Sequence, residues 1–315
     1  MAPESFSDVW RRVRLHVPAA PTFLVREWVN AAWKPLGRLR HWSFLYGELR
    51  LTIAAERSLA SVTTTNGSAT VTSAGLFVAA DEGRQFRTTN YPVYTIQTFT
   101  DLNTIQLDIP YGEAGGVSVA SIYDGYFTAP ADFESFRIIA DPYNQRRLAF
   151  WISADQLNIL DPTRQGSDSG PRLLAQRPPS TYTPTLGRPQ YEYWPRPTAA
   201  RSYPAYYNKL AARLDDTTIF SGVMSEAADV LVAGALAQAA LWPGTGDRPN
   251  PYFNAGLARE KKQEFYDGIQ HLSLRDDDQH PDDLATVHWE RWPLADLCYN
   301  DQALRATDAT VADLY

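Results

Sequence analysis

The sequence contains almost no cysteine: Cys298 is the single one among 315 residues. One thiol cannot form a disulfide within the chain, so no disulfide framework supports this fold. We therefore expect a protein that folds in a reducing cytoplasm, or an assembly that needs no disulfides.

Long apolar runs are missing as well. No run approaches the roughly 18 residues that a transmembrane helix requires. The first 14 residues are polar and amphipathic and have no apolar stretch of the kind found in a signal peptide. We expect neither membrane insertion nor secretion.

A basic excess is also absent, since the formal net charge is −7. Residues 276–315 hold ten acidic and two basic residues, whereas the rest of the chain holds 26 acidic and 27 basic ones. The net acidity is therefore confined to the C-terminal stretch. A body with balanced charge has no basic surface for phosphates, which argues against a dedicated nucleic-acid binder.

The common catalytic and cofactor motifs do not occur. The sequence lacks GxSxG, GxxxxGK[ST], GxGxxG and HExxH. The segment 166–170 (GSDSG) resembles a nucleophile elbow, but Asp168 occupies the place of the nucleophile. Cys298 has no nearby base. We predict no catalytic residue, no cofactor and no enzymatic activity.

One acidic run could in principle gather a hard cation through its oxygen ligands. Its members are Asp276, Asp277, Asp278, His280, Asp282 and Asp283. The run lacks the central Gly and closing Glu of an EF-hand loop. A solvated acidic linker is the favoured interpretation, and no metal site is predicted.

Aromatic residues, in contrast, are abundant, with nine Trp and seventeen Tyr. Such a surplus serves large interfaces, saccharide platforms or large cores. The densest group consists of Tyr191, Tyr193, Trp194, Tyr203, Tyr206 and Tyr207. We favour interface and core positions on paired strands, with a saccharide platform as the alternative. Carboxylate pairs for glycoside hydrolysis are defined only in three dimensions.

Helical periodicity marks both ends of the chain. Ser7 is a candidate N-cap for a first helix, and Pro21 stands where a second one starts, with Pro35 interrupting it. Residues 217–242 and 251–274 predict an antiparallel helix pair. The first of the pair presents Ala and Gly on one face, which implies a close helix neighbour.

The segment 58–125 differs in kind, being rich in Thr, Ser, Val and Gly. Asn66-Gly67 and the stretch 101–103 each predict a hairpin turn between alternating strands. This composition is typical of a small antiparallel sandwich or barrel. We favour an inserted domain over an elaborate sheet within one domain.

Residues 126–214 predict short strands at 135–139, 147–151, 190–194 and 205–210. Ser153 is expected to cap a short helix that ends at Leu160. The predicted fold class is α+β: a helical bundle core with short antiparallel strands and an inserted all-β, sandwich- or barrel-like module. The predicted domains are a core of 1–57 and 126–275, the insertion 58–125, and an acidic C-terminal arm 276–315.

Four segments together carry a resemblance to a known family. They are REWVNAAW with RLRHWSF between Arg26 and Phe44, GYFTAPADFESFRII at 125–139, GRPQYEYWPRP at 187–197 and PAYYNKLAARL at 204–214. Their order and spacing, over about two thirds of the chain, resemble the head-to-tail adaptor (connector) proteins of short-tailed bacteriophages. The positions that fill the family's pattern are Asn30, Trp42, Phe44, Tyr126 or Phe127, Pro130, Asp132, Phe133, Pro189, Tyr191, Pro195, Pro197, Tyr206, Tyr207, Lys209 and Leu214. The family's usual Leu before Pro130 is Ala129 here, and the segment 58–125 is an addition to the pattern.

The resemblance implies a structural virion protein, assembled in the host cytoplasm. Such a protein forms a ring, expected to be dodecameric, between the portal and a tail nozzle or tail-tube protein. Phage DNA would pass through the ring without sequence-specific binding, past an acidic channel surface. The alternatives are another tail component, a nozzle or tail-tube protein, or a glycan-binding or glycan-hydrolysing tail protein. The arm carries large apolar residues that a solvated tail would lack, which suggests docking through Trp289, Trp292, Leu297 and Tyr299.

Overall fold

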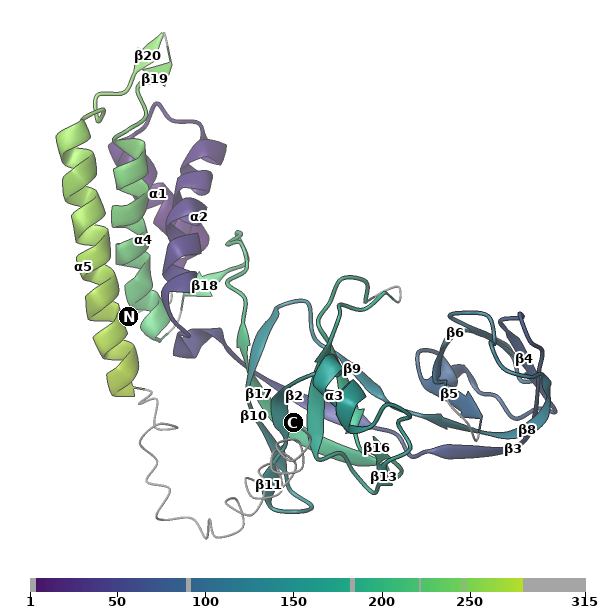
Figure 1. Cartoon of the computed structure of the whole chain (residues 1–315). Helices are drawn as coiled ribbons and strands as arrows, with labels where there is room; N and C mark the ends of the chain where they lie inside the picture. Colours follow the sequence, from purple (N-terminus) through teal and green to yellow (C-terminus); the bar gives the residue numbers. More distant parts are fainter. Residues whose placement is uncertain (1–3, 89–91, 182–184, 221, 246, 280–315) are drawn as a thin grey trace, which may run out of the picture. The chain divides into compact units, whose positions relative to one another are not determined.

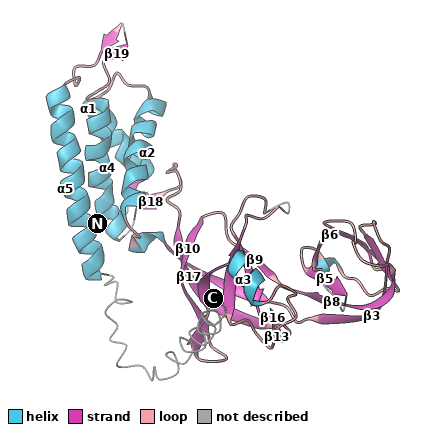
Figure 2. Ribbon diagram, in the orientation of Figure 1, coloured by secondary structure: helices cyan, strands magenta, loops and turns pink. Residues whose placement is uncertain are grey.

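The protein consists of two compact units. The computed structural model describes residues 4–88, 92–181, 185–220, 222–245 and 247–279. One unit, here called the helical unit, comprises residues 1–46 and 209–315, and the other, the strand unit, comprises residues 47–208. Figure 2 shows that helices dominate the first unit and strands the second.

The expected fold class, α+β with a helical bundle core, is wrong. The described residues form 20 strands in six sheets, one of them a closed barrel, against five α-helices. Within the described part of the strand unit the single α-helix is α3 (Ala154–Leu160). The error arose at the short alternating segments between 126 and 209. They build a large β core of their own and do not decorate a helical one.

The helical unit contains α1 (Phe6–His16), α2 (Thr22–Leu39), α4 (Val223–Ala239) and α5 (Ala255–Gln279) (Figure 1). The two-stranded pairs β1 (Glu4–Ser5) with β18 (Ile219–Phe220), and β19 (Gly244–Thr245) with β20 (Arg248–Pro249), are both antiparallel. A 3-10 turn, η1, spans Ser43–Leu45. None of the helices in the described ranges is long and apolar enough to cross a membrane.

Two details of the helix ends differ from the sequence prediction. The N-cap of α1 is Ser5, whose hydroxyl accepts a hydrogen bond from the Asp8 amide, and Ser7 lies inside the helix. Pro35 does not interrupt α2, which continues to Leu39. The buried Leu36 and the indole of Trp42, which donates to the Leu36 carbonyl at 2.7 Å, hold the turn that follows Pro35 in place.

Helix α4 lies at the centre of the helical unit and packs against α1, α2 and α5. Glu226 meets Arg275 and Val230 meets Gly268, so the residue numbers run in opposite directions along the two helices. The predicted antiparallel pair is confirmed. The small-residue face also has its neighbours: a Cβ on Gly234 would lie 2.7 Å from Phe265 and 2.8 Å from Ala32.

The segment between Arg57 and Tyr123 forms a closed antiparallel barrel in the order β3-β4-β7-β6-β5-β8. The strands are β3 (Arg57–Thr64), β4 (Thr70–Ser73), β5 (Gln85–Thr88), β6 (Tyr94–Asp101), β7 (Thr104–Leu107) and β8 (Gly116–Tyr123), with the 3-10 turn η2 at Ala79–Asp81. Both predicted hairpins are present, because β3 pairs with β4 around Gly67 and Asp101 pairs with Thr104. Gly67 has φ +77°, which a glycine adopts without strain.

Two four-stranded sheets form the rest of the strand unit. The first has the order β11-β10-β17-β2 and the second β12-β14-β15-β9. Their strands are β2 (Tyr46–Ile53), β9 (Tyr126–Thr128), β10 (Phe133–Asp141), β11 (Arg146–Arg147), β12 (Ala149–Ser153), β14 (Leu173–Arg177), β15 (Gln190–Trp194) and β17 (Arg201–Lys209). A separate two-stranded parallel pair consists of β13 (Ser167–Asp168) and β16 (Arg196–Pro197).

Side chains from both four-stranded sheets share one apolar core. On β17 the buried residues Tyr203, Ala205 and Tyr207 alternate, as the two-residue period of a strand requires. The predicted strand at 190–194 coincides with β15, and Ser153 caps α3 as expected. The barrel belongs to the same compact unit as these sheets.

Candidate functional site

The family-pattern residues of the helical unit stabilise the segments that connect its helices. The Asn30 side chain accepts a hydrogen bond from the Leu214 amide at 2.8 Å and donates to the Leu214 carbonyl at 3.3 Å. The fully buried ring of Trp42 stacks on Phe44, with ring centroids 5.5 Å apart. Asn30 therefore ties α2 to the segment before α4, and Trp42 with Phe44 secures the end of α2.

In the strand unit the pattern residues from three distant segments meet. Phe133 stacks on Tyr207, with centroids 5.6 Å apart, and contacts Tyr191 edge-on at 5.8 Å. The Tyr207 hydroxyl donates to the Asp132 carboxylate at 3.2 Å. The Phe133 amide donates to the Pro130 carbonyl at 3.2 Å. These contacts join β10, β15 and β17 into one cluster, here called the aromatic clamp (Pro130, Asp132, Phe133, Tyr191 and Tyr207).

The remaining pattern residues lie around this core. The carbonyl of Pro189 accepts a hydrogen bond from the Ala129 amide at 2.9 Å. Pro195 and Pro197 are buried on either side of Arg196, while Tyr206 is 45% exposed and Lys209 ends β17. The structure thus brings the pattern residues into two sets, one in each unit. Most of them hold the fold together and do not form a reactive centre.

The aromatic patch is mainly core. Tyr191, Tyr193, Tyr203 and Tyr207 are buried, and Trp194 is half-buried. A saccharide platform requires exposed ring faces, so these four tyrosines cannot supply one. Their burial supports the core part of the predicted interpretation.

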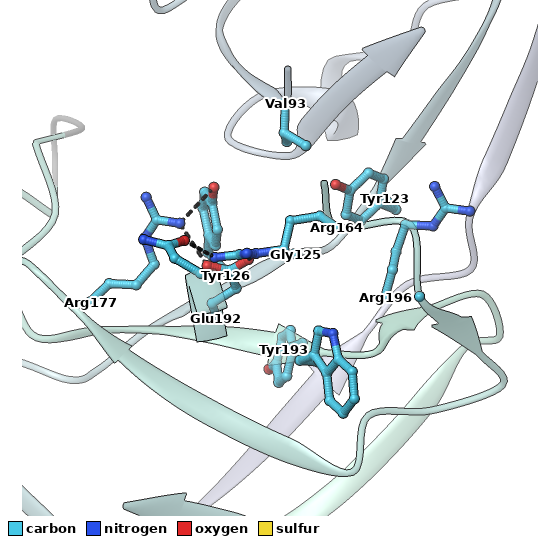
Figure 3. A pocket seen from close by; sticks show the side chains of 12 residues that line it. Val93, Tyr123, Gly125, Tyr126, Arg164, Arg177, Glu192, Tyr193 and Arg196 are labelled. Carbon is cyan, nitrogen blue, oxygen red and sulfur yellow. Dashed lines mark hydrogen bonds and ion pairs between the residues drawn. The ribbon is translucent and has the colours of Figure 1, made fainter. Parts of the chain in front are cut away.

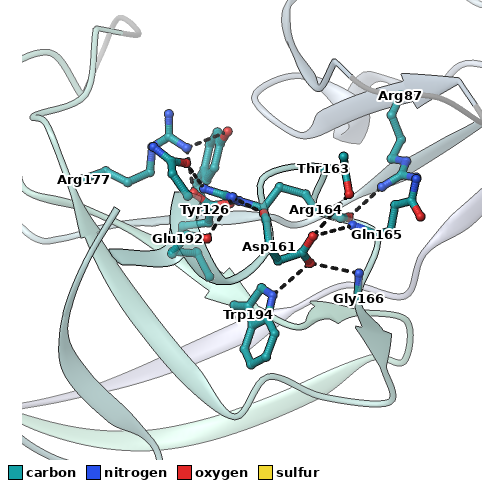
Figure 4. A network of polar contacts seen from close by, with 12 residues as sticks. Arg87, Tyr126, Asp161, Thr163, Arg164, Gln165, Gly166, Arg177, Glu192 and Trp194 are labelled. Carbon is teal, nitrogen blue, oxygen red and sulfur yellow. Dashed lines mark hydrogen bonds and ion pairs between the residues drawn. The ribbon is translucent and has the colours of Figure 1, made fainter. Parts of the chain in front are cut away.

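A charged network lies where the barrel meets the second four-stranded sheet (Figure 4). Glu192 on β15, only 5% exposed, accepts from Arg164 Nε at 2.5 Å and from Arg177 Nη1 at 2.8 Å. Arg177 Nη1 also donates to the Tyr126 hydroxyl at 3.0 Å. Because a buried carboxylate is costly unless it is paired, the two guanidiniums make this position possible for Glu192.

The loop after α3 holds Arg164 in this network. Arg164 has φ +53°, a left-handed conformation that is rare for a residue with a side chain. Its guanidinium donates to Asn158 Oδ1 at 2.6 Å and to the carbonyls of Leu157 and Asp161. Its own carbonyl accepts from Arg87 on barrel strand β5 at 2.8 Å. Such concentrated bonding compensates for a strained backbone, and strained residues often mark functional places.

Asp161 holds the same loop, the one after α3, through its carboxylate. Its carboxylate accepts from the Trp194 indole at 3.1 Å and from the amides of Gln165 at 3.2 Å and Gly166 at 3.0 Å. Burial works against the charged form, but these hydrogen bonds outweigh it and hold the pKa of Asp161 below its ordinary value. Asp161 is therefore ionised at neutral pH.

Sequence reasoning missed this network entirely. Arg164, Arg177 and Glu192 lie in three elements, and no short-range motif connects them. One usable indication was present: Glu192 stands between two tyrosines in the aromatic run Tyr191–Trp194 of β15. A charged residue in such a strand needs a partner.

The acidic arm is described only at its beginning. Asp276 lies in α5 and is buried, and it accepts from the Ser43 amide at 3.2 Å and pairs with Arg40 at 3.6 Å. The interpretation of Asp276 as part of a solvated linker is therefore wrong. His280, Asp282, Asp283, Trp289, Trp292, Leu297 and Tyr299 lie outside the described residues. Among the described residues no group of three or more His, Cys, Asp or Glu side chains could hold a metal ion.

No protein family model matches the chain, and no curated protein matches its sequence.

Proposed function

We propose that this protein is a structural subunit of a bacteriophage neck, which forms the ring between the portal and a short tail and lets DNA pass. The observation that carries the proposal is the aromatic clamp. Within the strand unit, residues of the resemblance that are up to 77 positions apart, from Pro130 to Tyr207, meet in one packed cluster.

Exposed apolar side chains add support. Phe23 on α2 is 69% exposed, and Trp151 and Ile159 in the strand unit are 70% and 79% exposed. Apolar groups that lie together in water are typical of surfaces that become covered on assembly, and these three are candidates for such a surface. The small-residue face of α4 gives no such support, because α2 and α5 already cover it.

The test uses the purified chain and the portal of the same phage. We expect a ring-shaped complex with about as many copies of the chain as of the portal subunit, measured by mass photometry and seen by negative-stain imaging. The portal of an unrelated short-tailed phage serves as the specificity control.

A folded chain that binds no portal would contradict the adaptor assignment. That outcome would favour a nozzle or tail-tube role, in which the chain would bind an adaptor ring. A glycan-active tail protein would instead bind or cleave host polysaccharide.

A further inference from the structure

A cavity of about 270 Å³ lies beside the charged network, between the barrel and the second sheet (Figure 3). Tyr123 at the end of β8 approaches it from the barrel. From the sheet side it is lined by charged and aromatic residues, among them Tyr126, Arg164, Arg177, Glu192 and Arg196. All these residues belong to the strand unit.

The acceptors in the cavity wall are already used. Both oxygens of Glu192 accept from guanidiniums, one from Arg164 and one from Arg177. The Asn158 side-chain oxygen accepts from Arg164. A ligand that needs to donate hydrogen bonds would find little to receive them.

The donors, in contrast, are only partly used. Arg196 Nε is buried and has no hydrogen-bond partner among the described residues. The Tyr123 hydroxyl, on a side chain only 4% exposed, also makes no hydrogen bond to any described residue, and Figure 3 shows it directed into the cavity. Arg177 uses Nη1 alone, so its other N–H groups remain available. Arg196 Nε is the one of these donors that is both buried and unsatisfied, and such a donor is costly, so this position favours a ligand that accepts.

The charges in the wall favour an anion. Three guanidiniums line the cavity and Glu192 is the one carboxylate among the lining residues. Two further carboxylates contact lining residues without being lining residues themselves. Glu56 pairs with Arg196 Nη2 at 3.5 Å, and Asp161 accepts hydrogen bonds from Trp194 and from the Gly166 amide.

We propose that this cavity binds a small oxyanion of the phosphate class, held by Arg177, Arg196 and Tyr123. Arg177 on β14, Arg196 on β16 and Tyr123 on β8 supply N–H and O–H donors from three elements, which suits an acceptor with several oxygens. The same chemistry could come from free phosphate or from a phosphorylated small molecule.

Two further features agree with this assignment. Burial raises the pKa of Tyr123 well above its ordinary value, so its hydroxyl is a hydrogen-bond donor at neutral pH. Arg196 lies over the Tyr123 ring, with its guanidinium carbon 5.2 Å from the centroid, and this contact holds the two donors together. The assignment does not depend on the phage role.

The test is isothermal titration calorimetry of the full chain with inorganic phosphate, and separately with acetate, at matched ionic strength. We expect saturable binding at one site per chain. Tyr123→Phe, which removes a single hydroxyl, should weaken it about fivefold, and Arg177→Gln about tenfold. Tighter binding of phosphate than of acetate would support the assignment, and the reverse order would overturn it in favour of a carboxylate ligand.

Arg172→Gln is the matched control, because it removes one positive charge from an arginine that is 59% exposed and does not line the cavity. It should leave the affinity unchanged. Near-ultraviolet circular dichroism checks that each variant is folded, and the isosteric Tyr123→Phe keeps the test valid if Arg177→Gln unfolds. Absence of saturable binding of both anions, an unchanged affinity in folded Tyr123→Phe, or an equal loss in Arg172→Gln would overturn the assignment.

Discussion

At the residue scale, a few polar side chains join segments that are distant in the sequence. Asn30 replaces a missing backbone partner for Leu214, and Asp276 holds the amide and hydroxyl of Ser43. Glu192 joins two arginines of different elements. In each case a buried polar group is satisfied by a segment distant in sequence, so its loss affects both segments.

Glu192→Gln should destabilise the protein, because it leaves the half-buried guanidiniums of Arg164 and Arg177 without their opposing charge. Breaking a buried ion pair from one side costs about 3 kcal/mol in the free energy of unfolding. Urea denaturation measures it. The matched control is Asp168→Asn, whose partner Arg172 is exposed, and which should cost less than about 1 kcal/mol. Equal losses in the two variants would contradict the central place given to Glu192.

The N-cap of α1 makes a prediction about pH. A hydrogen bond from the Ser5 hydroxyl, with one from the Ser5 amide, holds the pKa of Asp8 below its ordinary value of 3.8. A carboxyl with a lowered folded-state pKa contributes stability above pH 3.8, and this contribution is lost as the pH falls through the lowered pKa. Ser5→Ala should therefore raise the Asp8 pKa toward 3.8, as measured by NMR titration. Ser7→Ala is the comparison variant and should leave that pKa nearly unchanged; the opposite pattern would make Ser7 the cap.

At the element scale, α4 is the helix on which the helical unit depends. It is composed largely of Ala and Gly, so α2 and α5 can approach its backbone closely. Helices that pack this closely need complementary surfaces, so a larger side chain on this face of α4 would have no space.

Gly234→Ala should test this close approach. Alanine favours a helix over glycine by about 1 kcal/mol, but the new Cβ would lie 2.7 Å from Phe265 and 2.8 Å from Ala32. Overpacking of this kind costs about 1–3 kcal/mol, so we expect net destabilisation by thermal denaturation. Gly256→Ala is the control, since Gly256 is exposed near the start of α5. A more stable Gly234→Ala protein would show that the helices can separate at little cost.

At the scale of the whole molecule, the two units differ in what they could contribute to an assembly. The helical unit uses its small-residue surfaces internally, and each unit retains exposed aromatic or aliphatic side chains such as Phe23 and Trp151. The acidic arm is the remaining candidate for a contact between copies.

Deletion of residues 280–315 tests the docking role of the arm. The cut follows Gln279, because α5 extends to that residue and Asp276 is part of its buried anchoring. We expect the truncated chain to keep its circular dichroism spectrum and thermal midpoint but to form fewer complexes with portal in mass photometry. A deletion beginning at Asp276 is the comparison and should also lower the thermal midpoint. Normal assembly after deletion of 280–315 would contradict the docking role.

The local patterns in the sequence determined much of the secondary structure. The hairpins at Asn66-Gly67 and 101–103, the strand at 190–194, the cap at Ser153 and the antiparallel pair α4–α5 were all predictable, because turn geometry, capping and periodicity act between near neighbours. The same local rules misplaced the cap of α1 and ended α2 at Pro35. The competing hydroxyl of Ser5 and the packing of Leu36 and Trp42 decided those two places.

Tertiary structure alone decided the rest. That the alternating strands of 126–209 enclose a β core, so that the fold is mostly β, depends on which strands pair across large sequence distances. The meeting of Arg164, Arg177 and Glu192 follows from that pairing, as does the cavity beside them. Residue types and spacings fix what each segment can do locally, whereas charge pairing and burial are properties of the assembled sheets, because both depend on distances that only the folded chain sets.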